Sequence, residues 1–85
     1  MKSMITLLKK PTVLTNFGIS KSQLYLLIQK NLITPPISIS GGRSVAWPCN
    51  EVESIIKARI AGKSSEEIRL LVKVLVEKRK AGGDV

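Results

Sequence analysis

The chain contains no histidine and has a single cysteine, Cys49, among its 85 residues. Without an imidazole it cannot build a Ser-His-Asp triad, a Cys-His pair or a histidine metal site. One cysteine cannot close an internal disulfide or supply a CxxC zinc clamp. These absences predict no catalytic residues, no metal site and no cofactor, and therefore a protein that is not an enzyme. Cys49 is expected to be an inert residue near a helix start.

Long apolar runs are also missing. No segment approaches the roughly 18 apolar residues that a membrane span requires. The first ten residues hold only a short apolar stretch before Lys9 and Lys10, whereas a secretory signal has a longer apolar region and a small-residue cleavage site. We therefore expect a cytoplasmic protein with no membrane span.

Acidic residues are absent from the first fifty positions. That part carries Lys2, Lys9, Lys10, Lys21, Lys30 and Arg43, and the remaining 35 residues hold all the Asp and Glu of the chain. The formal net charge of +8 is therefore concentrated in the first fifty residues. Such a stretch suits a polyanion, because a carboxylate there would repel phosphates. Nucleic acid is the favoured partner; a membrane surface is the main competitor, and simple solubility is the third explanation.

The apolar spacing predicts two short helices joined by a tight turn. The first covers residues 11–17, and Gly18 favours a left-handed stop after it. Ser20 and Gln23 form a capping box for the second, which is expected to end near Asn31. Two short helices separated by a glycine-containing turn are typical of a helix-turn-helix motif.

A hairpin is predicted next. Residues 37–40 alternate apolar and polar side chains, and residues 43–47 form the return strand. Gly41-Gly42 predicts the tightest turn, in which both central residues have positive φ. Because so short a hairpin is not stable alone, Trp47 is expected to anchor it in the core rather than to stack on bases.

Two further helices complete the prediction. Asn50 with Glu53 is expected to cap a third helix, which buries Val52, Ile55, Ile56 and Ile60 and stops at Gly62. A second capping box, formed by Ser64 and Glu67, opens a last helix that runs to about Lys80.

The last helix is unusually apolar. Ile68, Leu71, Val72 and Leu75 form one stripe, which Leu70, Val74 and Val76 widen. Either the helix only covers the core, or residues 64–80 also bind a partner, namely a second copy of the chain or an integrase or polymerase subunit.

The predicted fold is mainly α with a small β-hairpin: a winged helix-turn-helix domain over residues 1–62, an additional C-terminal helix over residues 63–81, and a loose tail over residues 82–85.

Two stretches of the sequence together carry a family resemblance. The first contains Gly18-Ile19-Ser20-Lys21-Ser22, Leu24-Tyr25, Leu27-Ile28 and Pro36; the second contains Gly41-Gly42-Arg43-Ser44-Val45, Trp47 and Glu51-Val52-Glu53. With these residues the chain resembles AlpA-type phage and prophage regulators from residue 10 to residue 60. It departs from them at Leu26, Asn31 and Ile33, and in a spacer longer by Ser40. The resemblance implies a small winged-helix DNA-binding protein, related to MerR-type domains and excisionases, in the bacterial cytoplasm and nucleoid.

The same resemblance implies where double-stranded DNA is contacted. The amino end of the second helix would enter the major groove, and the wing tip would reach the minor groove. The expected DNA-binding residues are Ser20, Lys21, Ser22, Gln23, Tyr25, Lys30, Gly42, Arg43 and Ser44. For Ser20 and Gln23 a purely capping role is the alternative, and for Tyr25 a place at the core edge is the alternative. Lys9 and Lys10 are expected at most to contact phosphates.

The implied function is sequence-specific DNA binding for a phage, prophage or integrative element, as a transcriptional regulator or as an excision (recombination directionality) factor. A protein-interaction adaptor acting through the C-terminal helix is the alternative. An RNA-binding role is disfavoured, because the chain has only one Trp, one Tyr and one Phe, whereas RNA-binding sheets typically present aromatic residues.

Overall fold

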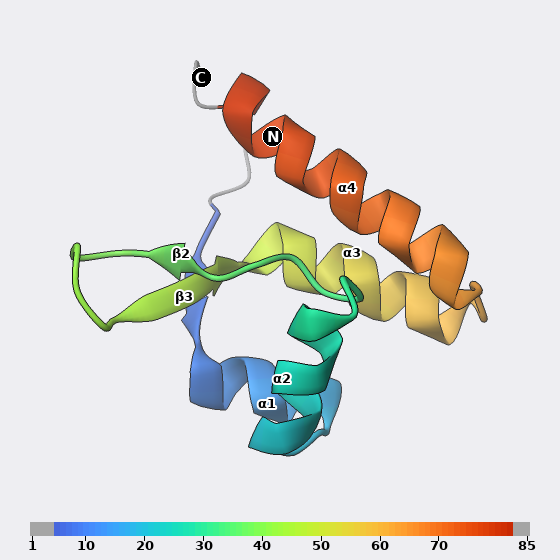
Figure 1. Ribbon diagram of the computed structural model, residues 1–85, viewed down its shortest axis with the longest axis horizontal. Coiled ribbons are helices and arrows are strands. Elements are labelled where there is room, and N and C mark those ends of the chain that lie inside the picture. Colours follow the sequence, from blue (N-terminus) through green and yellow to red (C-terminus); the bar gives the residue numbers. More distant parts are fainter. Residues whose placement is uncertain (1–4, 83–85) are drawn as a thin grey trace.

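The structure, a computed structural model, describes residues 5–82 (Figure 1). Within these residues the chain forms β1 (Leu7–Lys9), α1 (Lys10–Phe17), α2 (Lys21–Gln29), β2 (Ile37–Ser38), β3 (Val45–Pro48), α3 (Cys49–Ile60) and α4 (Ser65–Gly82). The helices α1 and α2 form the helix-turn-helix, and the loop from β2 to β3 projects to one side as the wing (Figure 1). The predicted fold class is confirmed. The loose tail was expected from residue 82, but Gly82 is still the last residue of α4. Residues 83–85 of the expected tail lie outside the described part.

The turn between α1 and α2 follows its local sequence signals. Gly18 adopts a left-handed conformation with φ of 69°, and the Ile19 amide donates to the Leu14 carbonyl at 3.1 Å. The Ser20 hydroxyl accepts from the Gln23 amide at 3.3 Å, while the Gln23 side chain accepts from the Ser20 amide at 2.9 Å. Both the glycine stop and the capping box are therefore confirmed, and they fix the direction in which α2 leaves the turn.

The sheet contains a strand that the sequence analysis missed. β1 pairs antiparallel with β3, with Leu8 opposite Trp47 and Lys9 opposite Ala46, so the strand order is β1-β3-β2. β3 is thus the central strand, and Ala46 and Trp47 on its opposite faces are both almost fully buried. The extra strand gives the short hairpin a third member, which a small sheet needs for stability.

The wing tip differs from the predicted two-residue turn. β2 ends at Ser38 and β3 begins at Val45, and the Ile39 amide donates to the Ser44 carbonyl at 3.1 Å across the loop. Gly41 has φ of 75°, whereas Gly42 is not in the positive-φ region. Because the closing hydrogen bond lies farther from the tip, the loop needs only one left-handed residue, and the tight-turn prediction was wrong.

The start and one buried position of α3 were also predicted wrongly. The helix begins at Cys49 rather than behind an Asn50 cap, because the Cys49 amide donates to the Thr6 carbonyl at 2.7 Å and so continues the pairing next to β1. The Cys49 sulfur in turn accepts from the Thr6 amide at 3.2 Å. Ile60, expected in the core, is 81 % exposed because it occupies the last turn before Gly62, whose φ of 79° confirms the predicted stop.

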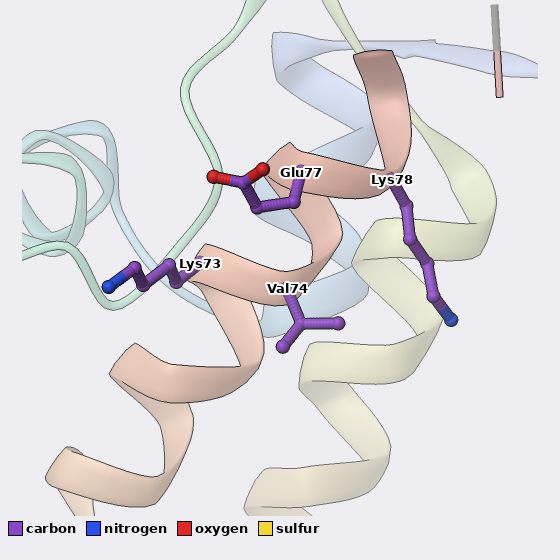
Figure 2. Close-up of a pocket in the computed structure, with 4 residues that line it drawn as sticks. All are labelled: Lys73, Val74, Glu77 and Lys78. Atoms are coloured by element: carbon purple, nitrogen blue, oxygen red, sulfur yellow. The ribbon is translucent and has the colours of Figure 1, made fainter. Parts of the chain in front are cut away.

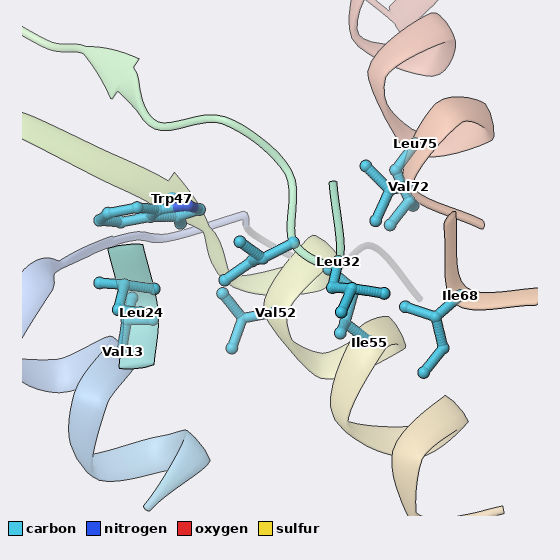
Figure 3. Packing of buried hydrophobic residues seen from close by; sticks show 10 residues of the cluster. Val13, Leu24, Leu32, Trp47, Val52, Ile55, Ile68, Val72 and Leu75 are labelled. Atoms are coloured by element: carbon cyan, nitrogen blue, oxygen red, sulfur yellow. The ribbon is translucent and has the colours of Figure 1, made fainter. Parts of the chain in front are cut away.

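One core joins the winged domain to α4. Figure 3 shows Trp47, Leu24 and Val13 at one end of this core and residues of α4 at the other, with Val52 and Ile55 of α3 between them. Trp47 is 1 % exposed and its indole N–H donates to the Thr34 carbonyl at 2.8 Å, which confirms its predicted place. The α4 members are Ile68, Val72 and Leu75, so this helix covers the core.

Two arginines of α4 also reach the rest of the fold. Arg69 donates from Nε to the Lys30 carbonyl at 2.8 Å. Arg79 forms two hydrogen bonds of 2.8 and 2.7 Å with the Glu51 carboxylate and donates at 2.7 Å to the Pro35 carbonyl. Within residues 5–82 no helix combines the length and the apolar character required to cross a membrane.

Candidate nucleic-acid interface

The exposed side of α2 begins at its capped end. Leu24 is fully buried, so the opposite side of the helix faces solvent. Lys21 and Ser22, the first two helical residues, are exposed. Their neighbours Ser20 and Gln23 are hydrogen-bonded to each other in the capping box, which agrees with the capping role predicted as their alternative. Contact between these four residues and DNA remains a prediction.

Tyr25 connects α2 to the start of α1. Its hydroxyl accepts a hydrogen bond from Lys10 Nζ at 2.8 Å, and the same ammonium lies 5.0 Å from the centroid of the phenol ring. The hydrogen bond from Lys10, assisted by its charge and that of Lys21, lowers the pKa of Tyr25 below its ordinary value. Tyr25 is 47 % exposed, so it does not lie at the core edge, which was one of its two predicted places.

A shallow basic hollow lies between the start of α1 and the wing. It is lined by Lys9, Lys10, Pro11, Arg43, Ser44 and Val45. Three cationic side chains and one hydroxyl therefore surround it, drawn from two segments that are more than thirty residues apart in the chain. The pairing of β1 with β3 brings the segments together. This donor set has the chemistry required to hold a phosphate oxygen.

These contacts order the basic residues into one strip. Lys21 and Tyr25 lie on α2, Lys10 bridges from Tyr25 to the hollow, and the hollow continues to Lys9 and Arg43 at the wing. We call these five residues the basic strip. No acidic residue occurs between residues 5 and 50, so within this described part nothing of opposite charge neutralises the strip.

The acidic residues of the described part of the chain instead lie on α3 and α4, and some are paired there. Glu51 binds Arg79 at 2.7 Å, and Glu53 binds Lys57 at 3.2 Å. The carboxylates of the described residues are thus confined to α3 and α4, whereas the helix-turn-helix and the wing carry only cationic charges. Such segregation raises the local concentration of a polyanion.

The structure brings together only part of the predicted site. Lys21, Tyr25, Arg43 and Ser44 belong to or border the basic strip, and Gly42 lies exposed in the wing loop beside Arg43. Lys30 lies apart, at the carboxyl end of α2. The sequence analysis gave Lys9 and Lys10 a minor role and missed β1, which brings them to the wing. The residues of this strand, Leu7-Leu8-Lys9, do not alternate apolar and polar side chains, so the sequence carried no strand signal there.

The chain is similar to phage-encoded proteins. The profile of the family described as "Prophage CP4-57 regulatory protein (AlpA)" matches residues 6–60, which include β1, the helix-turn-helix, the wing and α3. The "Uncharacterized protein ORF88" of Enterobacteria phage P4 is 41 % identical over 56 residues, and this similarity covers 66 % of the chain and 62 % of that protein. No solved structure matches the chain. α4 lies outside the matched family segment.

Proposed function

The chain belongs to the AlpA family of phage and prophage regulatory proteins, and from this premise we propose that it binds double-stranded DNA sequence-specifically to control a mobile element. The single observation that carries the proposal is the continuous, uncompensated basic strip from the first turn of α2 to the wing. A role as transcriptional regulator and a role as excision factor use the same contacts, and the proposal includes both.

In this proposal α2 lies in the major groove with its amino end toward the bases. Lys21 and Ser22 reach base edges, since the first turn of a recognition helix approaches them most closely. A lysine ammonium pairs with guanine O6 and N7, and a serine hydroxyl can donate or accept. Gln23 can offer a base only its side-chain NH₂ group, because its side-chain oxygen already accepts a hydrogen bond from the Ser20 amide.

The hollow and the wing supply contacts to the backbone. A phosphate placed in the hollow would meet Lys9, Lys10 and Ser44. Arg43 lines the same hollow from the wing, and in this proposal its guanidinium enters the adjacent minor groove. Contacts to phosphates fix the register of a protein on the duplex, and an arginine is attracted by the negative potential of a narrow minor groove. Tyr25 shares Lys10 with the hollow, so the same ammonium couples the position of α2 to the backbone contact.

Two alanine substitutions separate base reading from backbone contact. We expect Lys21→Ala to cost about 1–3 kcal/mol on a selected site and much less on random duplex, because it removes a base contact. Arg43→Ala is expected to weaken binding to both duplexes more evenly. Binding titrations with the selected and a scrambled duplex measure both effects.

Lys63→Ala, which removes an exposed lysine in the turn between α3 and α4, is the matched control and should leave both affinities unchanged. Equal loss on both duplexes from Lys21→Ala would make Lys21 a phosphate contact. No effect from Arg43→Ala would leave the wing a structural brace only.

A second candidate function rests on the outer side of α4. Leu70 and Val74, one turn apart, are 65 % and 49 % exposed, although they are large and apolar. Figure 2 shows Val74 between Lys73 and Lys78 in a shallow pocket that Glu77 also lines. The helix carries acidic residues in its first turn and basic residues in its last. A second copy in antiparallel orientation would match these opposite charges, so we propose self-association through this face.

Replacing both apolar residues with glutamate tests this surface. Leu70→Glu combined with Val74→Glu is expected to convert a concentration-dependent dimer to monomer without loss of helix content, since both side chains point away from the core. Light scattering over a concentration series, with circular dichroism as the control for folding, measures this. A monomeric unmodified protein at high concentration would remove self-association and leave an integrase or polymerase subunit as the occupant to test.

A further inference from the structure

Leu26 is an exposed apolar residue in the middle of the helix that is proposed to read DNA. It is 50 % exposed, whereas Leu24, two positions earlier, is fully buried. Two residues correspond to about 200° around an α-helix, so Leu26 points almost directly away from the core. Ser22 lies one turn before it and Gln29 nearly one turn after it, and both are exposed. Leu26 therefore lies at the centre of the solvent-facing side of α2.

The surroundings of Leu26 favour a nucleic acid over an apolar protein surface. Lys30, four residues and about one turn later, lies on the same side of the helix. Leu26 also borders a shallow hollow between α2 and the end of α3, in which Gln23, Lys30 and Arg59 lie beside the apolar Ile19, Leu27 and Leu32. The charged groups around this leucine are thus cationic, and a duplex meets them with phosphates. An apolar protein partner would leave these cations desolvated and unpaired.

The chemistry of the major groove then identifies what Leu26 can contact. A leucine side chain neither donates nor accepts hydrogen bonds, and burying a base donor or acceptor against it costs free energy. Among the base edges of the major groove, thymine presents a methyl group at C5. Resting on the proposed function of α2, we propose that Leu26 determines specificity by packing against the C5 methyl group of a thymine.

The proposal is tested by removing the methyl group from the DNA and the side chain from the protein. A high-affinity duplex is first selected from a random pool, and each of its thymines is replaced in turn by deoxyuridine, which lacks only that methyl group. At one position we expect a three- to fivefold loss of affinity, about the value of one buried methyl group. Leu26→Ala should bind the unmodified duplex more weakly and lose most of this sensitivity to deoxyuridine.

Ile60→Ala is the matched control, because Ile60 is an exposed, large apolar residue that lies on α3, outside both α2 and the proposed self-association face. It should keep the full deoxyuridine effect, and thermal melting should show both variants folded. The inference is overturned if no thymine position is sensitive in the unmodified protein, or if Leu26→Ala keeps the full sensitivity. It is also overturned if Leu26→Ala changes self-association and leaves DNA affinity intact. Failure of the unmodified protein to select any duplex would instead refute the proposed function itself.

Discussion

Raising the salt concentration from about 50 to about 200 mM is expected to weaken duplex binding by about a thousandfold. Each phosphate neutralised by a lysine or arginine releases condensed counterions, and the dependence of log affinity on log salt has a slope of about −0.9 per phosphate. Contact with about five to seven phosphates gives a slope of about −4 to −6. Lys9, Lys10 and Lys30 supply three of these contacts, and no carboxylate of residues 5–50 opposes them.

Single substitutions locate the charges that produce this slope. Lys9→Ala should reduce the slope by about 0.9, because it removes one phosphate contact from the hollow. Lys63→Ala removes the same charge from the turn between α3 and α4 and should leave the slope unchanged, because Lys63 lies outside the basic strip. Mobility-shift titrations at four or more salt concentrations measure each slope. If both variants change it equally, binding responds to net charge alone, and absence of any duplex binding at low salt would favour the adaptor.

The parts of the fold that the sequence predicts are those fixed by neighbours along the chain. The Ser20–Gln23 and Ser64–Glu67 capping boxes join residues three apart. The left-handed stop at Gly18 likewise depends on the last turn of its own helix. Such signals can be read one element at a time, which is why the helix-turn-helix and the opening of α4 are where they were predicted.

The parts that escaped prediction are held by residues far apart in sequence. β1 is only three residues long and exists because it pairs with β3, nearly forty positions later. The same pairing explains why α3 starts at Cys49, since the Cys49 amide donates a hydrogen bond to the Thr6 carbonyl beside β1. The hollow at the wing needs the same contact, so the sequence offered Lys9 and Arg43 as separate charges and could not place them together.

The pair of Arg79 with Glu51 is the clearest long-range interaction of this kind, and breaking it is expected to have the largest effect on stability. The Glu51 side chain is 4 % exposed and that of Arg79 is 22 % exposed. Arg79→Met should lower the free energy of unfolding by about 3–5 kcal/mol, because it leaves a buried carboxylate with no partner charge. Glu51→Met should cost less, since Arg79 keeps the Pro35 carbonyl and some solvent.

The double substitution separates the charge from the packing. Glu51→Met with Arg79→Met removes both charges and fills the space with apolar atoms of similar length, so we expect it to recover most of the loss. The exposed pair of Glu53 and Lys57 is the matched control, with side chains 65 % and 73 % exposed. Lys57→Met should change stability by less than about 1 kcal/mol, because solvent screens a surface pair. Urea unfolding followed by circular dichroism gives all four values.

The outcome bears on how α4 serves the DNA-binding surface. Arg79 connects α4 both to α3, through Glu51, and to the Pro35 carbonyl. Pro35 lies two residues before the wing strand β2. If the pair only adds stability, Arg79→Met at a temperature where the protein is still folded should bind DNA as the unmodified protein does. If α4 also positions the wing, we expect the same variant to lose affinity in the manner of Arg43→Ala, evenly on selected and scrambled duplexes. A cost of Arg79→Met no greater than that of Lys57→Met would contradict the buried-pair argument.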